Sequence, residues 1–341
     1  MFNNHVINFP IDDFNSILLN MKNAANKKPL WRGTVFIGNT PIYMEIHIKT
    51  IAAKIERYFM RTLPDVCVDG AKKLYVLNDG VDAFAKRPKN SVDYSCFLTS
   101  DTTIRPQLIV CNNCIFIHNS DEFFISLDDT EYNFRFIGEN HLMMKLFNYI
   151  LDDSVVLHGA VVGTDDFGVL ITGLSGAGKS TLAAHCLAQG VKFVGDDRIA
   201  INRVNDDIFA NPVYTTISLY NTMDGITIIG TDVQSASDKR NYILDKSQIS
   251  HNIKIKSVIE PVATHARTPS IIPHKKQYIL NKICMDYSNF SLIAKSTNVF
   301  KDYERISRLL NGCGYNIIEL SESIESNAKR IVDFIKTKGA N

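Results

Sequence analysis

The stretch that decides the fold is residues 168–189, which read GVLITGLSGAGKSTLAAHCLAQ. An apolar strand over residues 169–172 runs into a glycine-rich turn, and a helical pattern follows over residues 179–189. Residues 173–180 match the spacing G-x-x-x-x-G-K-[ST] of a P-loop. Because the motif and both of its flanks fit, the sequence predicts a phosphate-binding loop within an α/β domain. A plain strand–loop–helix turn is the alternative.

The residue types of this loop are those that hold phosphate. Glycines let backbone N–H groups turn inward around phosphate oxygens, and the positive end of the following helix adds to the attraction. We expect Lys179 to bridge the β- and γ-phosphates of ATP and the hydroxyl of Ser180 to bind Mg²⁺. The predicted nucleotide-binding residues are Gly173, Ser175, Gly176, Ala177, Gly178, Lys179, Ser180 and Thr181.

Two adjacent aspartates follow the loop at a short distance. Residues 192–194 are predicted to form a short strand, after which Gly195 leads directly into Asp196 and Asp197. Asp196 lies 17 positions after Lys179, which is one helix plus one short strand, so the carboxylates return to the phosphate end of the sheet. One carboxylate can hold Mg²⁺, directly or through water, and the other can take the proton of an attacking hydroxyl. A β-turn with solvated acids is the alternative interpretation.

Length and composition set the limits of the function. A chain of 341 residues predicts two domains at about 100–200 residues each. Lys plus Arg number 37 and Asp plus Glu number 36, and this balance argues against a general nucleic-acid or membrane-surface binder. Apolar runs fall far short of the roughly 20 residues of a spanning helix, so no membrane insertion is expected. Seven scattered cysteines and no basic-then-apolar N-terminal pattern favour a cytoplasmic location.

The rest of the chain is predicted as mixed α/β. Before residue 150 we expect helices over residues 12–25 and 140–151, hairpin strands at 31–37 and 42–48, and a strand at 73–77. Cys111 and Cys114 flank two asparagines, which is typical of a hairpin turn rather than a metal site. After residue 150 we expect strands at residues 155–162, 198–202, 242–244, 253–259 and 315–319, and helices at 301–310 and 321–336.

Three of these segments, in this order, resemble a known family. They are residues 157–162 (LHGAVV), the P-loop segment, and residues 193–198 (FVGDDR). A His-Gly strand before the P-loop, with Asp-Asp one helix after it, resembles the HPr kinase/phosphorylase family, whose kinase core is related to phosphoenolpyruvate carboxykinases. The resemblance covers about residues 154–203. It implies an α/β chain with an α+β N-terminal domain over residues 1–150, of no assigned role, and a mixed-sheet P-loop kinase domain over residues 151–341.

The resemblance also implies a function and residue roles. The family phosphorylates a serine of a protein substrate, so the chain is expected to be an ATP- and Mg²⁺-dependent kinase acting on a peptide or protein serine. Asp196 is then the catalytic base, and Asp197 assists the metal together with Ser180. His158 lies beside the phosphates and the acidic pair. The pair Lys239-Arg240 is the expected local source of the positive charge that neutralises the migrating phosphoryl group, and Arg240 is the residue assigned to this role; solvated loop charge is the alternative. Members of the family are often hexamers or other ring-like assemblies, so the resemblance is compatible with a homo-oligomer, and the oligomeric state stays open.

One segment departs from the family pattern. Bifunctional members carry a signature containing Glu-Ile-Arg-Gly after the aspartate pair, whereas residues 212–221 read PVYTTISLYN and contain no glutamate. This departure predicts a kinase without the reverse phosphorylase reaction, acting on an acceptor other than HPr. Two other functions stay open: a nucleotide-binding regulatory or scaffold protein that transfers no phosphate, and a small-molecule kinase.

Overall fold

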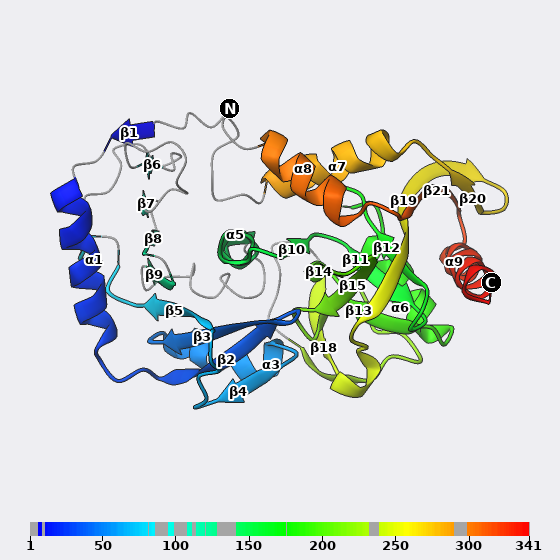
Figure 1. The fold of residues 1–341 in the computed structure, drawn as a ribbon. Coiled ribbons are helices and arrows are strands. Elements are labelled where there is room, and N and C mark those ends of the chain that lie inside the picture. The colour runs from blue at the N-terminus through cyan, green and yellow to red at the C-terminus, as the bar shows by residue number, and fades with distance from the viewer. Residues whose placement is uncertain are drawn as a thin grey trace. The chain divides into compact units, whose positions relative to one another are not determined.

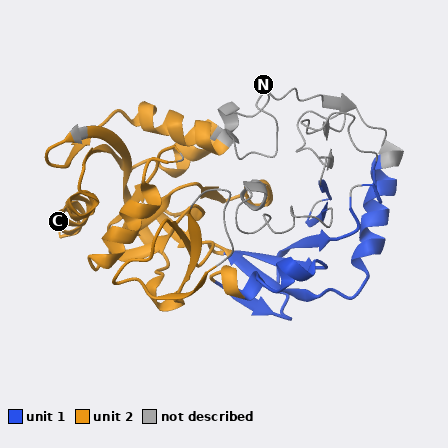
Figure 2. Cartoon of the chain, turned by 180° about the vertical axis from the view of Figure 1, so that it is seen from behind, with its two compact units in different colours: residues 1–36, 40–56, 61–143 blue, residues 37–39, 57–60, 144–341 orange. Residues whose placement is uncertain are grey.

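The computed structural model of the chain describes residues 6–8, 11–80, 82–85, 95–98, 108–110, 114–119, 121–127, 141–174, 176–231, 239–289 and 299–340. The chain divides into two compact units, which Figure 2 colours separately. The first comprises residues 1–36, 40–56 and 61–143, and the second comprises residues 37–39, 57–60 and 144–341. Among the helices of the described part, none is long and apolar enough to cross a membrane.

The first unit is built on a mixed sheet covered by helix α1 (Ile11–Ala25). Ile17 and Met21, one helical turn apart, are buried in α1 and pack with Ile115 and Phe124 of the sheet. Two one-turn helices, α2 (Lys49–Ala52) and α3 (Ile55–Tyr58), follow the hairpin. In spatial order, the strands described for this sheet are β1 (Val6–Asn8), β6 (Ser95–Leu98), β7 (Leu108–Val110), β8 (Cys114–His118), β9 (Glu122–Leu127), β5 (Lys72–Leu77), β3 (Thr40–Ile46), β2 (Trp31–Ile37) and β4 (Thr62–Pro64).

The predicted helix over residues 12–25 and the hairpin strands near residues 31–37 and 42–48 are confirmed by α1, β2 and β3. Strands β7 and β8 pair antiparallel on either side of the predicted Cys111–Cys114 turn. Cys111 itself lies outside the described residues.

The second unit contains a larger mixed sheet, a small three-stranded sheet and the remaining helices (Figure 1). The larger sheet runs in the order β10 (Ser154–Leu157), β14 (Ile199–Val204), β15 (Asp207–Pro212), β19 (Ile253–Ala266), β12 (Gly168–Ile171), β11 (Ala160–Gly163) and β13 (Lys192–Gly195), with β21 (Gly314–Ser321) beside β19 and β20 (Ser270–Pro273) beside β21. The small sheet consists of β16 (Thr216–Leu219), β18 (Arg240–Leu244) and β17 (Ile228–Thr231). The helices are α5 (His141–Ile150), α6 (Lys179–Ala188), α7 (Lys276–Asn289), α8 (Val299–Leu309) and α9 (Ile324–Gly339).

The large sheet is buried on both faces, and β12 shows this directly. Val169 and Ile171 join the core formed with α6 and α9, whereas Leu170, between them, joins the core formed with α7 and α8. Since successive side chains of a strand point to opposite faces, two helical layers enclose the sheet. The chain is therefore an α/β protein with mixed sheets, and this predicted fold class is confirmed.

Strand directions bring the site to one edge of the sheet. Strand β11 is antiparallel to both β12 and β13, so β12 and β13 point the same way and end at the same edge. The P-loop follows β12 there, and the aspartate pair follows β13. Residues 158 and 159, directly before β11, lie at that edge too, because Ala160 pairs with Ile171 at the end of β12.

The single strand predicted over residues 155–162 is wrong. The structure divides it into β10, which pairs with β14, and β11, which pairs with β12 and β13. His158 and Gly159 form the bend between the two strands. A Cβ atom on Gly159 would lie only 2.9 Å from the carbonyl oxygen of Ile171, so this close passage requires glycine. The bend takes His158 out of the strand ladder, and its ring faces Asp197 and Asp286.

Candidate active site

The P-loop is a tight turn between β12 and α6. Gly176 and Gly178 have φ angles of +86° and +84°, in the left-handed region that glycine adopts at little cost, and Gly178 caps α6. Helix α6 then begins at Lys179, and Ser180 and Thr181 lie in its first turn. These are the predicted positions of the phosphate-binding residues. Ser175, also predicted, lies outside the described residues.

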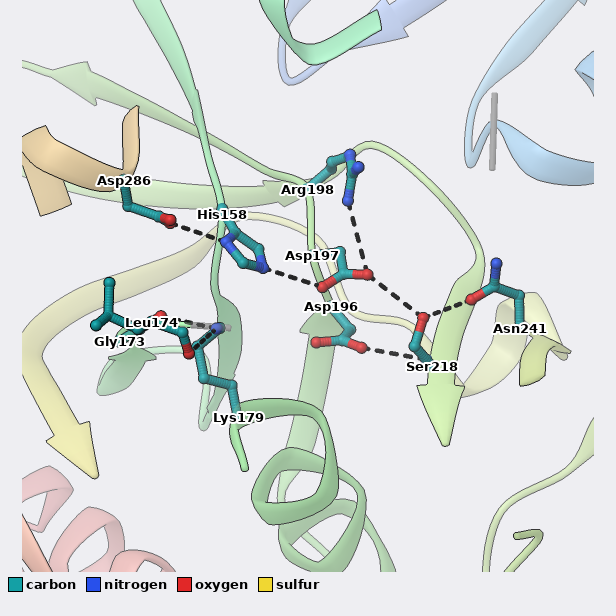
Figure 3. A network of polar contacts seen from close by, with 10 residues as sticks. All are labelled: His158, Gly173, Leu174, Lys179, Asp196, Asp197, Arg198, Ser218, Asn241 and Asp286. Atoms are coloured by element: carbon teal, nitrogen blue, oxygen red, sulfur yellow. Dashed lines mark hydrogen bonds and ion pairs between the residues drawn. The ribbon is translucent and has the colours of Figure 1, made fainter. Parts of the chain in front are cut away.

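Lys179 turns its ammonium group back over the loop (Figure 3). Its Nζ donates hydrogen bonds to the carbonyl oxygens of Gly173, at 2.7 Å, and Leu174, at 3.1 Å. Burial lowers the pKa of Lys179, while the nearby charges of Asp197 and Asp286 act in the opposite direction. The lysine is therefore a buried cation that faces carboxylates across the loop.

Asp196 is the more deeply buried member of the pair, with only 3% of its surface exposed. Its Oδ2 accepts a hydrogen bond of 3.2 Å from the backbone N–H of Ser218, while its buried Oδ1 has no hydrogen-bond partner within the described part of the chain. Burial and the adjacent charge of Asp197 raise the pKa of Asp196 to about 7, against the lowering effect of Ser180 and Ser218. A carboxyl group of this kind can take up and release a proton near neutral pH.

The carboxyl group of Asp197, in contrast, is kept ionised. Its φ angle of +63° is uncommon for a residue other than glycine and turns its carboxylate toward His158 and Arg198. His158 Nε2 lies 3.3 Å from Oδ1, and an Arg198 guanidinium nitrogen lies 3.6 Å from Oδ2. Burial alone would raise the pKa of Asp197, but the His158 hydrogen bond and the Arg198 charge outweigh it and hold the pKa well below its usual range.

His158 lies between two carboxylates. Its Nδ1 is 2.8 Å from Oδ2 of Asp286 on α7, and its Nε2 faces Asp197 (Figure 3). Burial alone would lower the pKa of His158, yet the hydrogen bonds with Asp197 and Asp286 raise it overall. Only the protonated imidazolium donates from both ring nitrogens, so this arrangement favours the charged form.

Ser218 of β16 connects the aspartate pair to the small sheet. Its hydroxyl oxygen lies 2.5 Å from Oδ1 of Asn241 on β18 and 3.3 Å from Oδ2 of Asp197. Its backbone N–H bonds to Asp196. One residue therefore contacts both carboxylates from the segment in which the family signature was missing.

The structure distinguishes Lys239, directly before β18, from Arg240, the first residue of that strand. Arg240 is exposed, and its strand neighbour Asn241 is the residue that faces Ser218, so Arg240 points to the other face of the strand. Lys239 is partly buried, and its charge contributes to lowering the pKa of Lys179. Of the two, Lys239 is the cation whose charge acts on Lys179 of the P-loop, and its Nζ lies 5.4 Å from the centre of the Tyr220 ring.

Four residues of this network were absent from the sequence prediction. Arg198 follows the aspartate pair directly, so its position was a signal that could have been used. Ser218, Asn241 and Asp286 lie 20 to 90 positions beyond the pair, and only the folded chain brings them to it. Asp286 lies on α7, a helix the sequence analysis did not predict.

The residues fit a nucleotide-bound Mg²⁺ better than a metal held by protein alone. In the parts of the chain that the structure covers, no group of three His, Cys, Asp or Glu residues could hold a metal ion. Mg²⁺ commonly binds one or two carboxylates together with substrate phosphates. The ionised Asp197 and the nearby Ser180 hydroxyl provide that kind of ligand set beside the P-loop.

Known proteins resemble the part of the chain that contains this site. Residues 150–269 match the family model described as HPr Serine kinase C-terminal domain. A segment of 161 residues is 29% identical to the HPr kinase/phosphorylase of Thermoanaerobacter sp. (strain X514), covering 46% of this chain and 44% of that protein. A shorter segment of 70 residues is 37% identical to the HPr kinase/phosphorylase of Alkaliphilus metalliredigens, covering 20% of this chain and 23% of that protein.

A solved structure, the Hpr(Ser) kinase/phosphatase from Coxiella burnetii, aligns over 55% of this chain and 99% of that one, with 15% sequence identity and a TM-score of 0.30. In sequence, the chain spans about half or less of the length of the curated relatives it matches.

Proposed function

We propose, from the HPr Serine kinase C-terminal domain at residues 150–269, that the chain is an ATP- and Mg²⁺-dependent kinase. It transfers the γ-phosphoryl group to a serine hydroxyl of a peptide or protein. The observation that carries the proposal is the pair of carboxyl groups beside the P-loop: Asp196 is buried, with an Oδ1 that has no partner among the described residues, whereas Asp197 faces His158 and Arg198. A protein that only binds nucleotide has no need of a buried proton acceptor at this position.

Asp196 takes the proton from the acceptor serine as its oxygen attacks the γ-phosphorus. Its pKa near neutrality suits this role, because a base works best when its pKa is close to the operating pH. Its buried Oδ1 has no partner in the described residues and is the atom available to receive the hydroxyl proton. The amide of Ser218 holds the other oxygen and fixes the orientation of the carboxylate.

The negative charge of the phosphates is balanced by a bound metal ion and by Lys179, and Asp197 and Ser180 hold the metal. When bound, Mg²⁺ neutralises charge on the β- and γ-phosphates; Ser180 and Asp197 are the residues proposed to hold it. Both oxygens of Asp197 face other side chains, which are His158, Arg198 and Ser218. When nucleotide binds, the Lys179 ammonium group exchanges its hydrogen bonds to the loop carbonyl oxygens for bonds to phosphate oxygens, because a cation binds a charged oxygen more strongly than a neutral one.

His158 and Arg198 keep Asp197 ionised, and Asp197 in turn keeps Asp196 able to bind a proton. Each link is electrostatic: the cations lower one pKa, and the resulting anion raises the other. His158 therefore acts on the reaction through the carboxylate pair. Arg240 remains a prediction as a phosphoryl-neutralising residue, and Lys239 is the better placed of the two.

The acceptor is proposed to be a serine other than that of HPr, and the reverse phosphorylase reaction is proposed to be absent. Support comes from residues 212–221, which lack glutamate and place Ser218 against the aspartate pair. Incubating the phosphorylated product with inorganic phosphate tests this point, because phosphorolysis would release pyrophosphate.

Labelled ATP tests the function itself. Purified protein is incubated with [γ-³²P]ATP, Mg²⁺ and a panel of serine peptides, HPr and small alcohols, and labelled products are hydrolysed to identify the phosphorylated residue. Phosphoserine in a peptide supports the proposal. Label in a small alcohol alone indicates a small-molecule kinase, and tight ATP binding without transfer to any acceptor indicates a regulatory nucleotide-binding protein.

A further inference from the structure

Helix α7 lies beyond residues 150–269, the segment that matches the family model, yet it reaches the site through two side chains. Lys282 and Asp286 are four positions apart and therefore project from the same face of the helix. Lys282 forms an ion pair with Glu260 of β19, and Asp286 contacts His158. Glu260 lies beside the start of the P-loop, since its Cγ is 3.8 Å from where a Cβ on Gly173 would be.

The contact between Asp286 and His158 is short and protected from water. Oδ2 of Asp286 lies 2.8 Å from Nδ1, and the exposed fractions of the two side chains are 14% and 10%. Burial of neighbouring Ile283 and Tyr287 in the core fixes this part of α7 against the sheet. The Asp286 carboxylate is therefore carried by a helix that is packed against the sheet, so it can hold the His158 ring in a fixed position.

We propose that Asp286 is a positioning residue that orients His158, so that Nε2 of the ring is directed at Asp197. A histidine ring has two nitrogens and can rotate, and a carboxylate on one of them fixes both the ring orientation and the proton on that nitrogen. Without Asp286, the ring can rotate away from Oδ1 of Asp197, 3.3 Å from Nε2. The inference rests on the proposed kinase function for its effect on rate, but the contact itself can be tested without turnover.

Activity measurements test the role through a double-mutant cycle. Asp286→Asn keeps the volume of the side chain and removes its charge, and Asp286→Ala removes the contact. We expect each to lower kcat by about 10–100-fold, the scale found for partners that orient a histidine, with little change in KM for ATP. In a His158→Ala background, Asp286→Ala should cause no further loss, because its effect passes through the ring. Gln277→Ala, exposed on the same helix, is the matched control and should match the wild type.

A second measurement keeps the test independent of catalysis. In protein labelled with ¹⁵N-histidine, His158 is identified among the nine histidines by its loss in His158→Gln. At one fixed pH, Asp286→Asn and Asp286→Ala should shift the ring nitrogen signals of His158, whereas Gln277→Ala should not. Unchanged ring signals, or losses of kcat that multiply in the double variant, would overturn the proposal. If the wild type transfers no phosphate but its ring signals respond to Asp286, the kinase function fails while the positioning contact stands.

Discussion

Asp196 and Asp197 are neighbours in the chain, and their pKa values are displaced in opposite directions. Asp196 is buried beside a negative charge, so its pKa rises to about 7, while Asp197 is bonded to His158 and lies near Arg198, so its pKa falls. Two chemically identical side chains thereby differ: one can hold a proton near neutral pH, and the other stays ionised. The positive φ angle of Asp197 makes this possible, because it turns the second carboxylate toward the two cations.

The first prediction concerns stability and pH in metal-free protein. An aspartate in an unfolded chain loses its proton near pH 4, whereas Asp196 in the folded protein keeps it to about pH 7. Between these values the folded state holds a proton that the unfolded state has lost, so the contribution of Asp196 to stability declines as the pH rises. We expect the melting temperature in EDTA to fall more steeply over this window in the wild type than in Asp196→Asn. Equal pH slopes in the two proteins would contradict the assigned pKa.

The hydroxyl of Ser218 gives a second prediction. Ser218→Ala keeps the amide bond to Asp196 and removes the contacts with Asp197 and Asn241. A hydrogen bond contributes about 1 kcal/mol, so kcat should fall by roughly 3–10-fold. Ser218→Thr retains the hydroxyl and suits a strand, and it should keep most of the activity. The steady-state rate of phosphotransfer is measured for both variants. If Ser218→Ala is as active as the wild type, the Ser218 hydroxyl does not support the aspartate pair.

Much of the site was predictable because it is local in sequence. The P-loop, Lys179 and the aspartate pair lie within 25 residues, and their strand, helix and turn signals need no tertiary information. The fold class and the long helices α1, α8 and α9 followed from hydrophobic periodicity in the same way. The resemblance based on these residues is confirmed, since the family model matches the segment that contains them.

The other features of the fold and of the site depend on contacts between distant parts of the chain, which hydrophobic periodicity cannot reveal. Residues 155–162 form a nearly continuous apolar run, and nothing in its pattern marks the bend at His158 and Gly159; the bend arises because β10 and β11 pair with different strands. Asp286 is 128 positions from His158, and helix α7, which carries it, went unpredicted. Ser218 lies on a four-residue strand, too short for a period to be recognised.

The bend at Gly159 yields a third prediction. In Gly159→Ala the new Cβ would meet the Ile171 carbonyl oxygen at 2.9 Å and a Leu170 methyl group at 3.1 Å. Forcing the strands apart should destabilise the protein by about 1–3 kcal/mol and displace His158. Gly314→Ala, whose nearest new contact is at 3.7 Å, is the control and should melt close to the wild type. Chemical denaturation of both variants measures this, and equal stabilities would show that the close passage does not require glycine.

The fourth prediction distinguishes Lys239, directly before β18, from Arg240, the first residue of that strand. Lys239 acts electrostatically on Lys179, whereas Arg240 is exposed and its side chain points away from Asn241. Lys239→Ala should therefore lower phosphotransfer by about 10-fold or more, the effect of removing one charge-assisted contact, while Arg240→Ala should change it less than about 3-fold. The reverse order of effects would return Arg240 to the role that the sequence suggested.

The central claim is that Asp196 accepts the proton of a serine during phosphoryl transfer from ATP. The most direct test compares wild-type protein with Asp196→Asn, measuring ATP binding and phosphoserine formation in parallel. We predict that the variant binds ATP as the wild type does and forms phosphoserine about 10²–10⁴-fold more slowly, the usual contribution of a general base. Asp196→Asn protein that forms phosphoserine at the wild-type rate would contradict the account.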